Sequence, residues 1–275
     1  PLQPEKIYDH ISWPVFIAVA VLFVIAILFY FFQTFFGFKK VARGDKAKMV
    51  GNVFSSVASR YDLMNNVMSF GIHHLWKNQF CDLVPKAAEN ILDVAGGTGD
   101  IALRAIKNGP AKRKVTICDI NYEMLVEGKN KAIDQGVLSG LNYIQGDAEN
   151  LPFADNSFDC YTIAFGIRNV TNIDKALLES YRVLKPGGKF LCLEFSKVES
   201  GHLAKLYDLY SFHIIPKFGG LIAGNEDAYR YLSESIRQFP DQEKFSSMIK
   251  NAGYSNVHYR NLNCGIVAIH MGYKI

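Results

Sequence analysis

The chain of 275 residues is long enough for one large domain, or for one domain with an appendage. Its hydrophobic content of 49% is ample for a core, and its net charge of +4 is too small to argue for a nucleic-acid partner. The five cysteines are scattered without a C-x-x-C pair, which argues against a disulfide framework and a zinc site. We therefore expect buried thiols in a reducing compartment and no bound metal.

The N-terminal segment, residues 1–38, contains a long apolar stretch. Residues 11–38 include no charged side chain, and residues 15–29 are apolar on every helical face. About 20 such residues suffice to cross a bilayer as a helix. The composition therefore predicts one transmembrane helix at about residues 13–36.

Two other interpretations of this stretch are a signal peptide and a buried soluble helix. A signal peptide has a basic start and a small-residue cleavage site, whereas Glu5 and Asp9 precede this core and bulky phenylalanines follow it. A buried helix is rarely apolar on every face over such a length. The basic stretch 39–48 then reads as a juxtamembrane linker. By the positive-inside rule it places the remaining chain on the cytoplasmic or matrix side of a bacterial cytoplasmic or mitochondrial inner membrane.

A single domain is predicted to fill residues 49–275. It begins with apolar residues near helical spacing over residues 49–76, which predict amphipathic helices. His73 and His74 lie in this region without the acidic neighbour at i+4 that a metal-binding helix has. We therefore interpret both histidines as side chains of a covering helix.

Residues 91–100, ILDVAGGTGD, join a short apolar run to a glycine cluster and then to a helical pattern. Strand, glycine turn and helix in this order form the first βα unit of nucleotide-binding α/β folds. Glycine lets the backbone turn tightly and lets a ligand approach where a Cβ atom would collide. The alternative is a glycine turn that binds no ligand, because a lone glycine motif is weak evidence.

The residue sequence of this turn favours S-adenosylmethionine over a dinucleotide as the ligand. Asp100 at the start of the helix would repel a pyrophosphate, whereas a sulfonium cofactor carries no phosphate and tolerates the carboxylate. The pattern Asp93-x-Ala95-x-Gly97-x-Gly99 resembles motif I of the class I methyltransferases. We therefore predict cofactor contacts from Asp93, Gly97 and Gly99.

Two further carboxylates follow the next two predicted strands. Asp119 follows a strand at 115–118, and an acidic residue at that place typically hydrogen-bonds ribose hydroxyls. Asp147 follows a strand at 142–145, where a carboxylate can accept a hydrogen bond from the adenine amino group. Either aspartate could instead cap a helix, but their positions after consecutive strands favour ligand contact.

Arg168 and Asn169 follow the predicted central strand, residues 158–165. In an open α/β sheet, ligands bind beyond the carboxyl ends of the strands. We therefore expect both side chains to lie where a substrate meets the methyl donor.

The remaining segments complete the predicted sheet. A helix at 176–184 and a strand at 189–195 precede a terminal hairpin at 254–261 and 265–271, which matches the antiparallel end of the methyltransferase sheet. The predicted fold is a Rossmann-like α/β class I methyltransferase, with a seven-stranded mixed sheet and helices on both faces, preceded by one transmembrane helix. The aromatic-rich insertion 197–240 is expected to cover a large apolar substrate, although simple helical packing explains any single aromatic residue there equally well.

Five segments carry motifs, of which the glycine turn is one. They are residues 61–76, 95–100 (AGGTGD), 165–170 (FGIRNV), 182–196 (RVLKPGGKFLCLEFS) and 229–236 (YRYLSESI). Together these segments resemble the ubiquinone/menaquinone biosynthesis C-methyltransferase family, over about residue 36 to the end of the chain.

The resemblance implies methylation of a ring carbon on a polyprenyl quinol precursor, either a methoxy-benzoquinol or a demethylmenaquinol, with S-adenosylmethionine as the methyl donor. It also implies cofactor contacts from Thr98, Asp119, Asp147 and Ala148. Ala164 departs from the family, which often has serine there, so a hydroxyl contact to the cofactor is lost or replaced by backbone. The transmembrane helix is a second departure, since the family is usually soluble or peripheral.

Carbon methylation requires an electron-rich ring carbon, which ionisation of the quinol hydroxyl provides. Arg168 keeps its proton because guanidinium pKa values exceed about 12. We therefore predict that Arg168 stabilises the phenolate and that Asn169 orients it. The base would be a water molecule, Asp147 or a histidine such as His213.

Two other functions stay open from the sequence. One is an inactive accessory subunit of a membrane respiratory complex, which the N-terminal segment and Ala164 motivate and the intact Asp119 and Arg168 oppose. The other is a methyltransferase for a different small molecule. A membrane anchor fits the first interpretation best, because a tethered enzyme meets a prenylated quinol of the bilayer, and other quinone-biosynthesis proteins, at high effective concentration.

Overall fold

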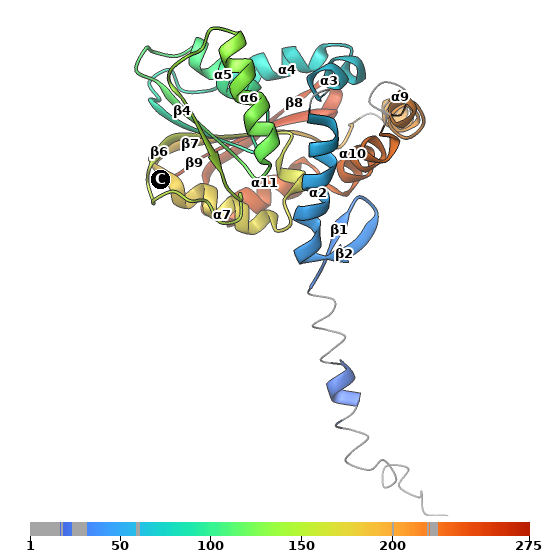
Figure 1. The fold of residues 1–275 in the computed structure, drawn as a ribbon. Coiled ribbons are helices and arrows are strands. Elements are labelled where there is room, and N and C mark those ends of the chain that lie inside the picture. Colours follow the sequence, from blue (N-terminus) through green and yellow to red (C-terminus); the bar gives the residue numbers. More distant parts are fainter. Residues whose placement is uncertain are drawn as a thin grey trace, which may run out of the picture.

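A seven-stranded mixed sheet forms the centre of the protein in a computed structural model (Figure 1). The structure describes residues 17, 19–23, 32–58, 61–199, 201–218, 220 and 225–275. The strand order is β5-β4-β3-β6-β7-β9-β8, in which β9 runs antiparallel to both of its neighbours and the first five strands are parallel. The predicted Rossmann-like sheet and its antiparallel end are confirmed.

The strands of this sheet alternate with helices along the chain. The strands are β3 (Asn90–Val94), β4 (Lys114–Asp119), β5 (Leu141–Gln145), β6 (Phe158–Ala164), β7 (Leu184–Phe195), β8 (Ser255–Leu262) and β9 (Val267–Tyr273). The helices that pack on them are α4 (Ile72–Cys81), α5 (Asp100–Lys107), α6 (Tyr122–Asp134), α7 (Ile173–Val183) and α11 (Gln242–Asn251). Two short 3-10 turns, η2 (Ile167–Asn169) and η5 (Asn263–Gly265), follow β6 and β8.

Each face of the sheet has its own apolar core because successive strand residues point to opposite sides. Ile91 of β3 packs with side chains of α4, α5 and α6, whereas its neighbour Leu92 packs with side chains of α7 and α11. Figure 1 shows these two helical layers above and below the sheet. Both residues are fully buried, so the central strand is covered on both faces, as in other parallel sheets.

Several helices start at a side chain that satisfies a free backbone N–H group. Asn121, Asn172, Asn225 and Asp241 each accept a hydrogen bond from the residue three positions later, at the beginning of α6, α7, α10 (Glu226–Gln238) and α11. Such caps typically contribute about 1 kcal/mol each. They fix where these helices begin, and the caps of α6 and α7 thereby define the ends of the loops that follow β4 and β6.

The predicted basic linker at 39–48 is wrong, because these residues are part of the folded structure. Strand β1 (Gln33–Phe36) pairs antiparallel with β2 (Lys39–Ala42) across a turn in which Gly37 has a φ of +57°. Helix α2 (Arg43–Val57) follows directly and crosses the predicted domain boundary. The hairpin packs on the rest of the molecule through Phe36, whose ring stacks on Tyr231 with centroids 4.1 Å apart.

The prediction of a single-pass membrane protein is corrected. In the described part of the chain, no helix has the length and the apolar character that crossing a membrane requires. Residues 33–36, at the end of the predicted span, form strand β1 instead of helix, because they pair with β2. Residues 13–16, 18 and 24–31 of that span lie outside the described residues.

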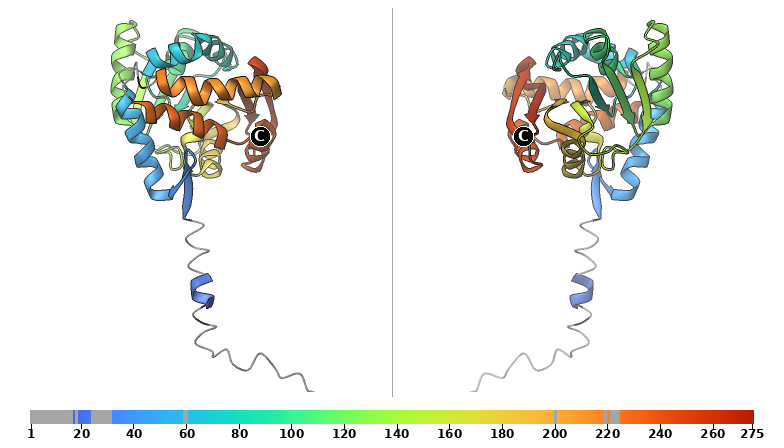
Figure 2. Two further views of the ribbon diagram at one scale, coloured as in Figure 1. Left: turned by 90° about the vertical axis from the view of Figure 1, so that its right-hand side faces the viewer. Right: turned by 90° about the vertical axis from the view of Figure 1, so that its left-hand side faces the viewer.

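The insertion predicted at 197–240 is helical. It contains α8 (Gly201–Leu209), the π-helical turn η3 (Tyr210–Ile214), α9 (Ile215–Phe218) and α10. In the left-hand view of Figure 2 these orange helices lie across the front of the molecule. With α2 and α3 (Tyr61–Ser69) they cover the region beyond the carboxyl ends of β3, β6 and β7.

Candidate active site

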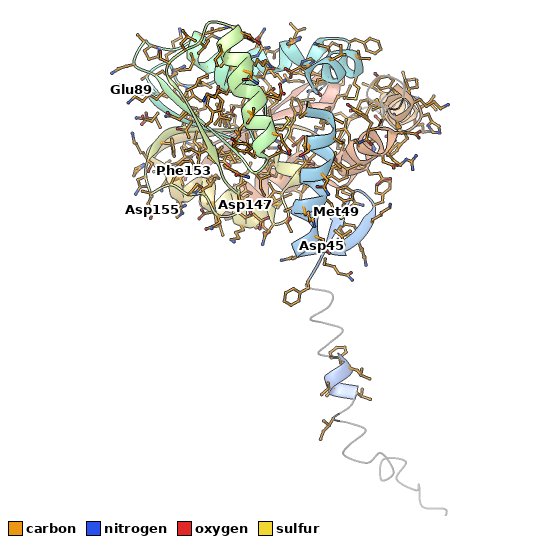
Figure 3. The ribbon with its side chains drawn as sticks, in the orientation of Figure 1. Asp45, Met49, Glu89, Asp147, Phe153 and Asp155 are labelled. Carbon is orange, nitrogen blue, oxygen red and sulfur yellow. The ribbon has the colours of Figure 1, made fainter. Side chains whose placement is uncertain are left out.

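A cavity of about 550 Å³ lies beyond the carboxyl ends of β3, β4, β5 and β6. Its size falls within the range of about 300–1,000 Å³ that small-molecule pockets have. Helix α2, marked by Asp45 and Met49 in Figure 3, lies beside this end of the sheet, where Asp147 is labelled. We call this space the cofactor cavity. Of the predicted cofactor residues it is lined by Gly97, Asp119, Asp147, Ala148 and Ala164.

Asp119 lies at the end of β4 and holds the glycine turn in place. Its Oδ2 accepts a hydrogen bond from the Gly97 N–H at 2.8 Å, and its Oδ1 accepts one from the Asn121 N–H at 2.8 Å. Burial raises the pKa of the carboxyl, and the backbone N–H groups oppose this rise. Asp119 is thus a preorganised acceptor with lone pairs left for ligand hydroxyls.

The glycine turn itself leaves no room for larger residues. Gly97 has a φ of +53°, and a Cβ atom there would lie 3.1 Å from the Met124 side chain. A Cβ atom on Gly96 would meet Ile117 at 2.8 Å and the Asp93 carboxylate at 2.9 Å. Close approach of the backbone to its surroundings therefore explains these two glycines.

Three predicted cofactor residues occupy other places. Asp93, Thr98 and Gly99 are not among the described residues that line the cofactor cavity. Asp93 is buried beneath the glycine turn, where its Oδ1 accepts a hydrogen bond from the Thr162 hydroxyl at 2.8 Å and burial raises its pKa to about 7. The Thr98 hydroxyl points to Asp62 of α3 at 3.4 Å, and Gly99 precedes α5 with a φ of +74°.

Asp100 also points away from the cofactor cavity. It pairs with Lys77 of α4 at 2.7 Å and with Arg104 at 3.3 Å. Burial tends to raise its pKa, but Lys77 and the other cations outweigh burial and lower it. The carboxylate that was expected to repel a pyrophosphate instead joins α4 to α5.

A second cavity of about 250 Å³ adjoins the first and is mainly apolar. We call it the acceptor cavity. It lies between α2, α3, α4, the strand ends and the helices of the insertion. Its apolar and aromatic lining includes Phe54, Trp76, Phe165, Phe195, Tyr207, Tyr210, Ile215, Tyr229 and Leu232. Phe54, Phe165 and Asn169 line both cavities, so the two spaces share a wall.

Arg168 lines the acceptor cavity and is bound to a buried carboxylate. Its Nη1 donates a hydrogen bond to Glu194 Oε1 at 2.7 Å, and its guanidinium lies 5.5 Å from the centre of the Phe195 ring. Its Nε is buried without a hydrogen-bond partner among the described residues. Glu194 was not assigned a role from the sequence, yet the carboxylate compensates the Arg168 charge and fixes the guanidinium.

Asn169 is held by Tyr231, a residue of the predicted covering insertion to which the sequence assigned no individual role. The Tyr231 hydroxyl of α10 donates a hydrogen bond to Asn169 Oδ1 at 2.9 Å. Since both side chains line the acceptor cavity, the Asn169 amide group is oriented at the boundary with the cofactor cavity. Arg168 and Asn169 therefore lie together, as expected for residues after the central strand.

His213 does not reach this site. It is exposed on η3, and it is absent from the described residues that line either cavity. The π-helical turn directs Ser211 inward and His213 to solvent. His213 therefore lies outside both cavities and is not placed to act as the predicted base. Asp147 lines only the cofactor cavity.

Three groups of metal-ligand type lie together beside the acceptor cavity. Ligand atoms of His73, His74 and Asp100 lie within 4.8 Å of one another. His73 Nδ1 is hydrogen-bonded to the Ser69 hydroxyl at 2.6 Å. The Asp100 carboxylate is ion-paired with Lys77 and Arg104. Burial, and then the Lys77 charge, lower the pKa of His73 to about 4. With two cations beside them, these groups form a hydrogen-bonded network that joins three helices.

Comparison with known sequences decides the family. Residues 41–274 match the model of the ubiE/COQ5 methyltransferase family. The chain belongs to this family. The ubiquinone/menaquinone biosynthesis C-methyltransferase UbiE of Rickettsia bellii is 54% identical over 246 residues, 88% of this chain and 99% of the relative. The UbiE protein of Bartonella bacilliformis is 55% identical over 243 residues, 87% of this chain and 94% of the relative.

Solved structures agree with the fold of the family. A SAM-dependent methyltransferase of Thermotoga maritima superposes with a TM-score of 0.57 at 20% identity, over 82% of this chain and all of that chain. The [4+2]-cyclase SpnF also shares the fold, with a TM-score of 0.55 at 18% identity over 82% of this chain and 94% of that chain. Because these neighbours have different reactions, the likeness shows the fold alone.

Family membership confirms three predictions made from the sequence. The enzyme is an S-adenosylmethionine-dependent C-methyltransferase of the ubiE/COQ5 type, and S-adenosylmethionine is its cofactor. The cofactor cavity fits this group, because Asp119 and Asp147 place acceptors at the ends of adjacent strands and Gly97 leaves room between them. The alternative of an inactive accessory subunit receives no support from these relatives.

Proposed function

We propose that this enzyme methylates a ring carbon of a prenylated quinol precursor of ubiquinone or menaquinone. The proposal rests on one observation above all, the wall of Phe54, Phe165 and Asn169 that the cofactor and acceptor cavities share. The two cavities meet at these three residues. A methyl group held in one cavity can therefore reach an aromatic ring held in the other only at this boundary. The mainly apolar lining of the acceptor cavity suits a prenylated ring rather than a polar metabolite.

Arg168 is proposed to stabilise the phenolate form of the quinol. When bound, S-adenosylmethionine supplies an electrophilic methyl group on a positively charged sulfur. The Arg168 guanidinium lines the acceptor cavity and places positive charge beside a developing oxyanion, while Glu194 keeps the guanidinium in position. Asn169, fixed by Tyr231, orients the same oxygen. Stabilising charge in a preorganised, water-poor site is often the largest single contribution to catalysis.

A water molecule is proposed as the base that accepts the hydroxyl proton. Asp147 lines the cofactor cavity but not the acceptor cavity, and burial makes His73 a poor proton acceptor with a pKa of about 4. Arg168 lowers the pKa of the bound hydroxyl by favouring its anion. Water then suffices, and positioning of the ring supplies much of the remaining acceleration.

The deciding experiment is methyl transfer from labelled S-adenosylmethionine to a chemically reduced demethyl-quinol with a short prenyl chain. We expect label in the ring of the product, and a loss of about 10²–10³ in kcat for Arg168→Met. Arg260→Met, at an exposed arginine of the edge strand β8, is the matched control and should retain normal turnover. Cofactor binding without transfer to any quinol would refute the acceptor class, whereas no cofactor binding would refute the assignment of the cofactor cavity.

A further inference from the structure

The outer side of the helices that cover the acceptor cavity combines apolar and basic side chains. The outer face consists of the exposed residues His202, Lys205, Leu206, Leu209, His213 and Lys217. They belong to α8, η3 and α9, which follow one another without a break. Their spacing of mostly three or four positions places them on one side of this helical run. Leu206 and Leu209 are 63% and 54% exposed, which is unusual for neighbouring leucines on a helix.

The charge of this face is one-sided. Residues 201–218 contain a single carboxylate, Asp208, and it is ion-paired with Arg237 of α10. Lys205 and Lys217 flank the two exposed leucines along the chain, and two histidines lie near them. Within the described residues of this helical run, no carboxylate is left to balance the lysines. The face is therefore complementary to an anionic surface with an apolar interior.

The inner side of the same helices forms part of the acceptor cavity. Tyr207, Tyr210 and Ile215 line that cavity, whereas their neighbours on the outer face are exposed. The helical run therefore lies directly between the acceptor and the surroundings of the protein. Whatever binds the outer face is one helix diameter away from the bound acceptor.

The acceptor cavity reaches the surface beside this helical run. Phe70 lines the cavity although 79% of its surface is exposed. Its ring centroid lies 6.1 Å from that of Tyr210, the first residue of η3. Ile72, at the start of α4, also lines the cavity and is 37% exposed. An apolar entrance thus opens at the edge of the outer face.

We propose that the outer face of α8–α9 binds the surface of an anionic lipid bilayer, and that the prenyl tail of the acceptor enters the cavity past Phe70. Helices with basic residues and exposed leucines on one side lie in the bilayer interface in this way. Each lysine near an anionic bilayer strengthens binding by about fivefold. The route for the tail rests on the proposed function, whereas the binding of the face to lipid does not.

Hydrogen exchange of the full chain with vesicles tests the binding surface. The vesicles contain phosphatidylcholine with or without about one-third phosphatidylglycerol. We expect slower exchange of residues 201–218 and 68–76 with the anionic vesicles, and a weaker effect with neutral ones. Vesicle binding without slower exchange of 201–218 would refute the proposal. Equally slow exchange before vesicles are added would also refute it, because another part of the chain or a second copy would then cover the face.

A charge-reversal variant tests the function of this surface. Lys205→Glu/Lys217→Glu should raise KM at least tenfold for a long-chain acceptor embedded in anionic vesicles. The same variant should leave kcat/KM for a short-chain acceptor in detergent unchanged, because neither lysine lines a cavity. The matched control, Lys244→Glu/Lys250→Glu, changes two exposed lysines of α11 and gives the same net charge.

The outcomes separate this proposal from the proposed function. Equal rises in KM for both double variants would refute docking through α8–α9, since the effect would then come from net charge. An unchanged KM of Lys205→Glu/Lys217→Glu for the long-chain acceptor in anionic vesicles would refute docking while the proposed function stands. If no quinol is methylated but 201–218 is still protected by anionic vesicles, docking stands and the acceptor class is wrong.

Discussion

Asp119 combines two tasks in one carboxylate, because it accepts backbone hydrogen bonds from the glycine turn and lines the cofactor cavity. Asp119→Asn keeps the shape but replaces one acceptor oxygen by a donor. Hydrogen bonds to charged groups contribute about 1.5–3 kcal/mol, so we expect the Kd for S-adenosylmethionine to rise roughly tenfold to a hundredfold. Calorimetric titration measures this, with the exposed Asp134→Asn on α6 as control. A Kd within twofold of the parent would contradict the assignment.

Glu194 acts through Arg168 and is therefore a positioning residue. Glu194→Gln removes the carboxylate that binds the guanidinium at 2.7 Å in a fully buried place. Leaving a buried charge without its partner typically costs about 3–5 kcal/mol of stability. We expect kcat to fall at least tenfold, while KM for S-adenosylmethionine changes less than twofold. Urea unfolding and steady-state kinetics report the two effects.

A matched variant distinguishes this role from a general effect of lost charge. Glu127→Gln changes an exposed carboxylate on α6 and should alter neither quantity. If Glu194→Gln lowered stability but left kcat intact, Glu194 would serve folding only, and the positioning role would be wrong.

Sequence could locate those site residues that lie at, or just after, the carboxyl end of a predicted strand. Asp119 ends strand β4, Asp147 follows β5 by two residues, and Asn169 lies in the turn η2 after β6. Parallel strands end at one edge of the sheet, so these three residues lie at that edge. Glu194 could have been found as well, because a charged residue inside the apolar run of β7 needs a buried partner. The contact of Tyr231 with Asn169 could not, since it depends on how α10 packs.

At the scale of elements, the β1–β2 hairpin is connected to the reacting groups. Phe36 stacks on Tyr231 with an interplanar angle of 15°, and the Tyr231 hydroxyl binds Asn169. Aromatic pairs are worth about 0.5–1.5 kcal/mol beyond their buried area. Phe36→Ala should therefore reduce kcat up to about tenfold, with little change in cofactor affinity.

The adjacent strand residue supplies the control for this prediction. Phe35 points to the opposite side of the hairpin and is 43% exposed. Phe35→Ala should leave kcat within twofold of the parent. Equal losses in the two variants, measured by steady-state kinetics at saturating cofactor, would show that the hairpin affects activity only through stability.

The hairpin also shows why the N-terminal part was predicted incorrectly. Its first strand is apolar and uncharged, so it continues the composition of the preceding stretch without a visible break. The turn signal was present in Gly37, between two short runs with β-forming residues. Hydrophobic composition alone could not separate a strand that pairs with its neighbour from the end of an apolar helix.

On the scale of the whole molecule, a buried histidine of the sheet is expected to make stability depend on pH. His270 of β9 is 1% exposed, and its Nε2 lies 3.1 Å from the Gln242 carbonyl. Burial lowers its pKa to about 4. Because the unfolded chain binds a proton below pH 6.5 and the folded chain does so only near pH 4, stability falls as the pH is lowered between these values.

The His270→Phe variant isolates this contribution. The relevant quantity is the free energy of unfolding of the parent minus that of the variant. This difference should decrease by up to about 2 kcal/mol when the pH is lowered from 7 to 5. The difference between the two proteins is the useful quantity, because the raised pKa of Asp93 acts in the opposite direction in both. Urea unfolding at the two pH values measures it. Parallel pH profiles of the parent and the variant would show that His270 does not titrate as described.

The overall fold was predictable because its signals repeat along the chain. Strands β4, β5 and β6 agree with the predicted strands to within a residue, and the terminal hairpin has the predicted order. Strand β7 begins at Leu184 rather than at residue 189, since its pairing with β6 extends across the Pro-Gly-Gly turn. The arrangement of the covering helices follows from tertiary packing, so periodicity could only predict that they are helical.

Helix α2 closes two spaces at once. Gly44, Ala47 and Gly51 line the cofactor cavity, Val53 and Val57 line the acceptor cavity, and Phe54 lines both. A rigid helix cannot withdraw from one cavity and leave the wall of the other intact. We therefore expect release of the spent cofactor to be coupled to release of the methylated product. Because the two cavities meet, we also expect direct transfer with both substrates bound, which predicts intersecting lines in double-reciprocal plots rather than the parallel lines of a ping-pong scheme.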